Sequence, residues 1–163
     1  MGSRLPGACL VGSWNPIPPF EVIQARCVAF NREVIERYGG AQTNRPAEGC
    51  LEKSIAAAYN AELYAGNEDA VGLCFIGALM FFVTKNQCFI DGNKRTGLAI
   101  CLWMLLRFGL TLGCPQERVS AFFLGIAGNT VRNREEAVLW LAQNIIAIET
   151  DLPAPPPEDE ISF

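Results

Sequence analysis

The feature that most constrains the fold is a short polar segment between two long apolar runs. Residues Gln87 to Arg95 read Gln-Cys-Phe-Ile-Asp-Gly-Asn-Lys-Arg, with the uncharged run Ala70–Thr84 before them and the apolar run Leu98–Leu106 after them. Runs that are apolar on every side predict buried helices rather than amphipathic surface helices. The polar segment is therefore expected to be a loop at the shared end of two central helices in an all-α bundle.

Within this segment the residues indicate a turn followed by a helix start. Asp91-Gly92-Asn93 is typical of turns, because glycine adopts positive φ freely and Asp and Asn tolerate it. A helix that begins at Asn93 or Lys94 presents free backbone N–H groups and the positive end of its dipole. Because Lys94 and Arg95 add two cations to that first turn, we expect an anion site, for phosphate in particular. The Asp91 carboxylate beside them could hold Mg²⁺ against phosphate oxygens.

This segment resembles the signature loop of the Fic/Doc superfamily, His-x-Phe-x-Asp/Glu-Gly/Ala-Asn-Gly/Lys-Arg. It is most similar to the death-on-curing (Doc) branch, in which Lys precedes the arginine and Thr follows it. The matching positions are Phe89, Asp91, Asn93, Lys94 and Arg95, and Gly92 and Thr96 fit the Doc form. The departure is Gln87, which stands where the family has its catalytic histidine, in a chain that contains no histidine.

The resemblance implies a set of functional residues. The catalytic positions would be Gln87, Asp91, Asn93, Lys94 and Arg95, and the nucleotide-binding positions Phe89, Gly92, Asn93, Lys94, Arg95 and Thr96. Asp91 would be the Mg²⁺ ligand on the phosphates of ATP or another nucleotide. The two cations would neutralise charge that shifts in the transition state. In the broad family such a site moves AMP from ATP to a protein hydroxyl. In the Doc branch it moves the γ-phosphate to a threonine of elongation factor Tu, and Lys94 favours that kinase variant.

Gln87 decides whether this chemistry can proceed. Transfer to a hydroxyl requires a general base, and a carboxamide only donates or accepts hydrogen bonds. Loss of a positioned general base costs about 10²- to 10⁴-fold in rate. We therefore expect a Doc-like toxin of a toxin–antitoxin pair that is inactive or impaired. Two other interpretations remain: a degenerate Fic-fold binding module for a nucleotide or a partner helix, and an all-α domain whose loop is only a turn and helix start.

Composition and charge limit the partners and the location. The net charge of −4 and pI near 4.9 argue against a nucleic-acid binder. The uncharged run Ala70–Thr84 has 15 residues, whereas a membrane span needs about 20, and no signal peptide is recognisable. These features predict a soluble cytoplasmic protein. The resemblance adds a nucleotide, a protein substrate with a Ser, Thr or Tyr hydroxyl (elongation factor Tu as one example) and an antitoxin helix as partners.

The seven cysteines are scattered and odd in number, without a Cys-x-x-Cys pair. Without histidine as well, a zinc site is not expected. Cys74 and Cys101 lie in apolar runs, where free cysteine behaves as a small hydrophobic residue. Cys88 is interpreted as a buried inert thiol, and the whole set as typical of a reducing, cytosolic environment.

The chain order predicts one domain of about six or seven helices at residues 20–150, between a Pro/Gly-rich extended arm at 1–19 and a Pro-rich acidic tail at 151–163. The expected helices are Phe20–Tyr38, Cys50–Tyr64, Ala70–Thr84, Thr96–Phe108 with its first turn at Asn93, Gln116–Ile126 and Arg134–Ile148. In the first of them, Asn31 and Arg32 take the places where Doc-like proteins often have a His-Asp pair. The stretch from Thr43 to Glu48 nearly matches an inhibitory Ser/Thr-x-x-x-Glu-Gly motif of some Fic proteins, but its spacing is one residue too long.

Overall fold

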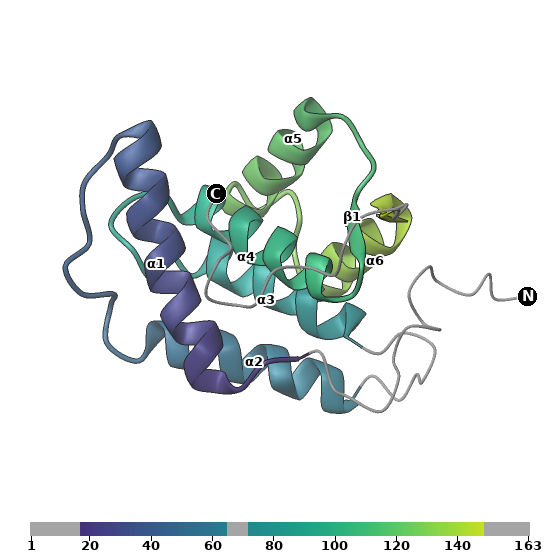
Figure 1. Cartoon of the computed structure of the whole chain (residues 1–163), viewed down its shortest axis with the longest axis horizontal. Helices are drawn as coiled ribbons and strands as arrows, with labels where there is room; N and C mark the ends of the chain where they lie inside the picture. Colours follow the sequence, from purple (N-terminus) through teal and green to yellow (C-terminus); the bar gives the residue numbers. More distant parts are fainter. Residues whose placement is uncertain (1–16, 65–71, 149–163) are drawn as a thin grey trace, which may run out of the picture.

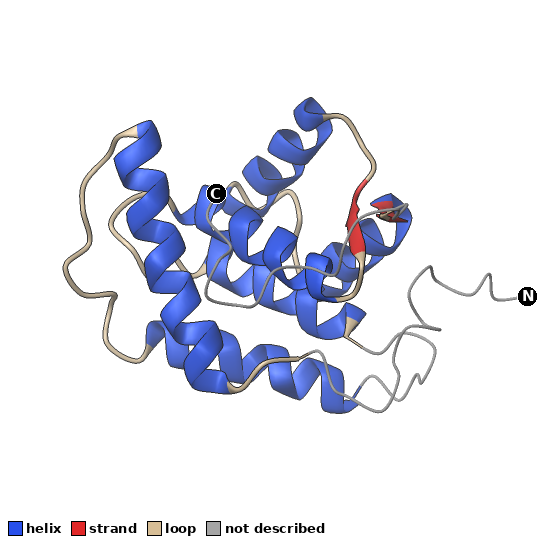
Figure 2. Cartoon of the chain, viewed as in Figure 1, coloured by secondary structure: helices blue, strands red, loops and turns tan. Residues whose placement is uncertain are grey.

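In a computed structural model of the chain, residues 17–64 and 72–148 are described. They form six helices and two short strands: α1 (Phe20–Tyr38), α2 (Cys50–Tyr64), α3 (Leu73–Lys85), α4 (Asn93–Arg107), β1 (Leu110–Leu112), α5 (Gln116–Ala127), α6 (Arg134–Asn144) and β2 (Ile145–Ala147). Figure 2 shows how completely helix dominates, and the predicted all-α class is confirmed. Most of the predicted N-terminal arm and all of the predicted C-terminal tail lie outside the described residues.

Helix α3 is the centre of the fold, as its uniformly apolar sequence predicts. It packs against α2, α4 and α6 (Figure 1), and nearly all of its residues are buried. Its first turn is held by Glu62 of α2, whose carboxylate accepts hydrogen bonds from the backbone N–H groups of Gly72 (2.7 Å) and Phe75 (3.0 Å). The helix begins at Leu73, later than the predicted Ala70, after Gly72 in the left-handed conformation.

Helices α3 and α4 approach closely at Gly97. A Cβ built at Gly97 would overlap Thr84 Oγ1 of α3 and lie 3.3 Å from the Met80 carbonyl oxygen. Both Gly97 and Thr84 are buried. We expect Gly97→Ala to lower the free energy of unfolding by about 1 to 3 kcal/mol, because overpacking forces neighbouring atoms to shift. Urea denaturation of the variant tests this.

The matched control is the same substitution in a Thr84→Ala background. There the overlapping hydroxyl is gone, so Gly97→Ala should cost less. An equal cost in both backgrounds would contradict the assigned contact, because the penalty would then come from elsewhere in the helix.

The predicted last helix of the domain is too long. The predicted helix Arg134–Ile148 stops at Asn144, and Ile145–Ala147 instead pairs antiparallel with Leu110–Leu112. Two consecutive β-branched residues favour the extended conformation. The pairing also depends on β1, which lies far away in the sequence, so the periodicity of the segment alone did not reveal it.

Two buried thiols lie in the core. Burial raises the pKa of Cys27 and of Cys101 to about 12, so both stay protonated at neutral pH. Cys101 is thus the small hydrophobic residue that the sequence predicted. Cys74 is half-buried, and burial also raises the pKa of its thiol.

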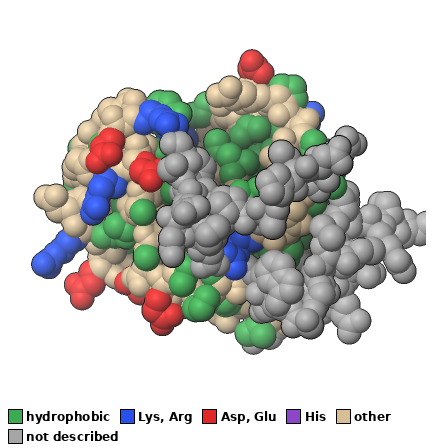
Figure 3. All heavy atoms as spheres, viewed as in Figure 1, with side chains coloured by type: hydrophobic (Ala, Val, Ile, Leu, Met, Phe, Trp, Pro, Cys, Tyr) green, Lys and Arg blue, Asp and Glu red, His purple; other side chains and the backbone are tan. Residues whose placement is uncertain are grey.

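On the face of the molecule seen in Figure 3, acidic and basic side chains are interspersed over the part where α1 lies. Among the described helices, none is both long enough and apolar enough to pass through a membrane.

Candidate functional site

The predicted signature loop connects α3 to α4 and lies beside the connection between α1 and α2 (Figure 1). Two hydrogen bonds join these connections. The N–H of Ala47 donates to the Cys88 carbonyl oxygen (2.9 Å), and the N–H of Ile90 donates to Thr43 Oγ1 (2.8 Å). The loop is therefore anchored by the helices at its two ends and also by hydrogen bonds to a segment more than forty residues earlier in the chain.

The loop ends in the helix start that the sequence predicts. Gly92 takes a φ of 76°, α4 begins at Asn93, and the N–H of Thr96 donates to the Gly92 carbonyl oxygen (2.9 Å). Among the described residues, no acceptor pairs with the backbone N–H groups of the first three helical residues. Lys94 and Arg95 are exposed in this turn. Free N–H groups and two cations at a helix N-terminus make this end of α4 suited to an anion.

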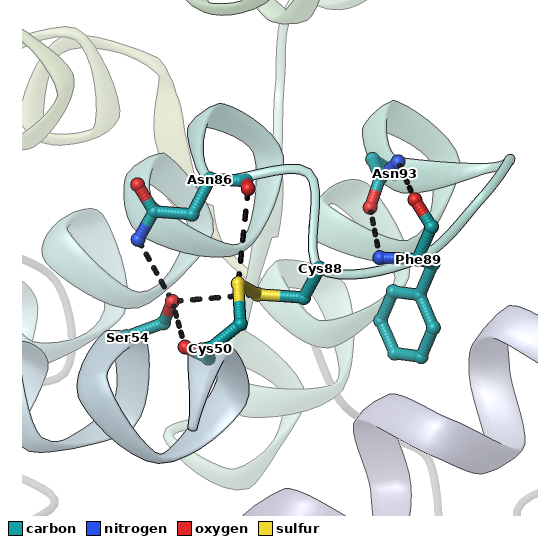
Figure 4. The surroundings of a disulfide bond; sticks show 6 residues. All are labelled: Cys50, Ser54, Asn86, Cys88, Phe89 and Asn93. Atoms are coloured by element: carbon teal, nitrogen blue, oxygen red, sulfur yellow. Dashed lines mark hydrogen bonds between the residues drawn. A yellow bond between two sulfur atoms is a disulfide. The ribbon is translucent and has the colours of Figure 1, made fainter. Parts of the chain in front are cut away.

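Asn93 is turned back into the loop. Its Oδ1 accepts a hydrogen bond from the N–H of Phe89 (3.1 Å), and its Nδ2 donates to the Phe89 carbonyl oxygen (2.9 Å), as Figure 4 shows. Phe89 itself is buried. Both residues thus have a structural role in closing the loop, and their predicted contact with a nucleotide stays a prediction.

Asn31 of α1 is a site residue that the sequence did not reveal as one. It is buried, and its Nδ2 donates to the Asp91 carbonyl oxygen (2.8 Å) and to Thr96 Oγ1 (3.2 Å). The Thr96 hydroxyl in turn donates to the Gly92 carbonyl oxygen (2.8 Å). One amide therefore fixes the turn and the helix start across sixty residues of sequence. The sequence contained two signals, a polar residue within the apolar face of an amphipathic helix and the resemblance that sets Asn31 and Arg32 at the places of a His-Asp pair. Its neighbour Arg32 is exposed.

Asp91 is exposed, and its Oδ2 accepts a hydrogen bond from the N–H of Ala41 (3.0 Å). Its other carboxylate oxygen has no partner among the described residues. In the same part of the chain, no group of three or more His, Cys, Asp or Glu side chains could hold a metal ion. A single carboxylate beside an anion site fits Mg²⁺, which proteins commonly bind through one or two carboxylates together with phosphate oxygens and water.

The Arg95 side chain contacts the end of α1. Its guanidinium lies over the ring of Tyr38, 4.4 Å from the ring centroid. Next to it a pocket of about 690 Å³ opens between α1, α4 and α5, with Val34, Leu98 and Leu102 among its apolar lining residues. The sequence predicted Arg95 as a functional residue but indicated neither its partner nor the pocket.

Gln87, at the position of the family's histidine, is exposed and has a φ of 50°. Only a few per cent of residues other than glycine adopt this left-handed conformation, and such residues occur often at functional sites. The backbone of the loop thus presents the side chain at position 87 to solvent, and that side chain is a carboxamide.

The structure contradicts the prediction that Cys88 is an inert thiol. Cys88 forms a disulfide with Cys50, the first residue of α2, although the two are 38 positions apart (Figure 4). Beside the disulfide, Asn86 Nδ2 donates to Ser54 Oγ (2.9 Å), and Ser54 Oγ donates to the Cys50 carbonyl oxygen (2.8 Å). The first half of the loop is therefore tied to α2. Because these two cysteines are paired, the cysteine content is no longer an argument for a reducing compartment, and the cytoplasmic location stays a prediction.

The near match to an inhibitory motif has a simple structural account. Thr43 accepts the hydrogen bond from Ile90, and Glu48 is exposed just before α2, where a negative charge suits the helix N-terminus. These contacts support a role of Thr43 in holding the loop.

Comparisons with known proteins agree with this geometry. The search of curated proteins finds no match for the chain. The model of the Fic/DOC family matches residues 23–105, which is just over half of the chain and runs from α1 through the signature loop to the end of α4. This match sets aside the interpretation of the loop as a mere turn and helix start. The chain therefore belongs to the Fic/DOC family, which gives it a Fic-type nucleotide-modifying function at the level of the family.

Proposed function

We propose that the protein is a Doc-like enzyme that transfers a phosphoryl or nucleotidyl group from ATP to a protein hydroxyl, with its activity impaired at Gln87. One observation carries the proposal. The charged residues expected to bind the phosphates and their metal are all present, with Asp91 exposed just before α4 and Lys94 and Arg95 exposed in its first turn, while the position of the general base holds a carboxamide.

Each part of this end has a physical role. The free N–H groups of the first turn of α4 would donate hydrogen bonds to phosphate oxygens, and the dipole of the helix favours the negative charge of those oxygens. Lys94 and Arg95 would balance the charge that shifts toward the leaving group. Mg²⁺, when bound, would supply additional positive charge on the phosphates, and Asp91 would hold it.

The attacking hydroxyl oxygen forms a bond to phosphorus, the bond to the leaving phosphate oxygen breaks, and the hydroxyl proton must leave. Gln87 can accept a hydrogen bond from that hydroxyl but cannot take its proton at neutral pH. The proton would pass to solvent without a positioned base, which explains why we expect slow or absent transfer.

Lys94 supports the kinase variant of the reaction, with transfer of the γ-phosphate to a threonine such as that of elongation factor Tu, over AMP transfer. By the same similarity, the protein would be the toxin of a toxin–antitoxin pair. The pocket that Arg95 helps to line would then suit an amphipathic helix of the antitoxin, because Val34, Leu98 and Leu102 offer it an apolar surface among charged and polar residues.

A second candidate function is a binding module that holds a nucleotide or a partner helix without catalysis. The observation that favours it is the absence of histidine from the whole chain, combined with an intact loop. The two candidates differ in what a histidine at position 87 would do, because only an impaired enzyme regains transfer.

Removal of the Asp91 carboxylate or of the Arg95 guanidinium is expected to weaken the binding of Mg-ATP. Asp91→Ala should lose the metal ligand and Arg95→Ala a charge-assisted hydrogen bond, each costing several-fold or more in affinity. Isothermal titration calorimetry measures this. Arg132→Ala is the matched control, because it removes an exposed arginine near the start of α6. Unchanged affinity in both site variants would remove the phosphate site from the proposal.

A further inference from the structure

We propose that Tyr38, the last residue of α1, is a positioning residue for Arg95. Its ring would hold the guanidinium beside the start of α4 with the N–H groups directed to phosphate oxygens. This inference rests on the proposed function, in which Arg95 is a phosphate-binding cation.

The contact itself is well defined. The guanidinium carbon lies 4.4 Å from the centroid of the Tyr38 ring, where the ring quadrupole attracts a cation. Among the described residues, Arg95 has no ion-pair or hydrogen-bond partner. A guanidinium can stack on an aromatic face and still donate from its edges. The side chain is therefore held in place while its donors stay available to a ligand.

The same end of α1 also holds the predicted metal ligand. After Tyr38, Gly39 and Gly40 take φ values of 83° and 119°, and this turn brings the N–H of Ala41 to 3.0 Å from Asp91 Oδ2. A Cβ built at Gly40 would lie 3.1 Å from the same oxygen. The segment 38–41 thus contacts two of the three charged side chains of the site. The Tyr38 ring contacts Arg95, and the backbone N–H of Ala41 contacts Asp91.

The expected benefit is preorganisation. A free arginine loses rotamer freedom when it binds a phosphate, and a side chain that is already stacked loses less. Without the ring we expect the affinity for Mg-ATP to fall about two- to fivefold, the range of an exposed cation–π contact. Tyr38 is 57% exposed, so its replacement leaves the core intact.

The test is a double-mutant cycle measured by calorimetry with Mg-ATP. The variants are Tyr38→Leu, Tyr38→Phe, Arg95→Ala and the combination Tyr38→Leu/Arg95→Ala, each checked for an unchanged thermal unfolding midpoint. Tyr38→Phe keeps the ring and should bind like the unsubstituted chain. Tyr38→Leu should bind two- to fivefold more weakly, and the combination should bind no more weakly than Arg95→Ala alone.

Two results would overturn the positioning role. The first is that Tyr38→Leu binds Mg-ATP as tightly as the unsubstituted chain. The second is that Tyr38→Leu lowers the affinity by the same factor whether or not Arg95 is present. These results are distinct from failure of the proposed function. If the unsubstituted chain does not bind Mg-ATP, the phosphate site itself fails, and the positioning role fails with it.

Discussion

Replacement of Gln87 by histidine is expected to raise the rate of group transfer from ATP to a protein hydroxyl by about 10²- to 10⁴-fold. The loop already holds position 87 exposed, in a left-handed backbone conformation. Histidine is similar in reach to glutamine and has a pKa near neutrality, as a general base requires. Transfer of label from ATP to elongation factor Tu measures the gain. Label from γ-labelled ATP reports kinase activity, and label from α-labelled ATP reports AMP transfer.

Two further variants make this result specific. Gln87→Asn keeps a carboxamide and should stay as slow as the chain with glutamine. Gln87→His combined with Asp91→Ala should lose the regained activity, because the metal ligand is gone. Equal rates with glutamine and histidine at position 87, on every substrate tried, would contradict an impaired enzyme and favour the binding module.

Loss of the Cys50–Cys88 disulfide is expected to lower the free energy of unfolding by about 2 to 4 kcal/mol, because a long loop in the unfolded chain is no longer closed. The two cysteines are 38 residues apart, which places the effect in the upper part of that range. Urea denaturation with and without a dithiol reductant measures the difference. The backbone hydrogen bond from Ala47 to Cys88 would remain, so the loop should loosen rather than detach.

The control for this experiment is a Cys50→Ala/Cys88→Ala variant. Its stability should be close to that of the reduced chain and insensitive to reductant, whereas Cys114→Ala should behave like the unsubstituted chain. If reduction leaves the urea midpoint of the unsubstituted chain unchanged, the disulfide does not contribute to stability in solution.

The elements that could be predicted from sequence are those set by local pattern. The run from Phe20 to Tyr38 alternates apolar and charged residues at helical spacing and ends before two glycines, and α1 has those bounds. The start of α4 at Asn93 was predictable because Gly92 marks the turn. The burial of α3 followed from its lack of any polar face.

The features that could not be predicted are contacts between segments that lie far apart in the sequence. The Cα atoms of Cys50 and Cys88 lie 5.4 Å apart, within the range that a disulfide allows, and the packing of α2 against the loop brings them there. The hydrogen bonds of Asn31 cross sixty residues or more, so the helix around it gave no sign of its partners. Strand β2 forms because it pairs with β1. The helical spacing of apolar residues in Arg134–Ile148 predicted a helix there and gave no sign of this pairing.

The same distinction holds within the site. The motif names the residues expected at the site, and the structure places the charged ones at or just before the start of α4. The structure also shows that the side chains of Asn93 and Thr96 form hydrogen bonds that hold the loop. From α1, Asn31 bonds to the loop and the ring of Tyr38 contacts Arg95. A motif carries the residue types a reaction needs, whereas the side chains that orient them come from elsewhere in the chain.

The central claim is that the start of α4 binds the phosphates of a magnesium nucleotide. The most direct test is calorimetric titration of the purified chain with Mg-ATP, alongside the Arg95→Ala and Arg132→Ala variants. We expect saturable binding by the unsubstituted chain and by Arg132→Ala, and binding weakened several-fold or more in Arg95→Ala. Absence of binding by the unsubstituted chain, or equal affinity in all three, would contradict a nucleotide site at this helix.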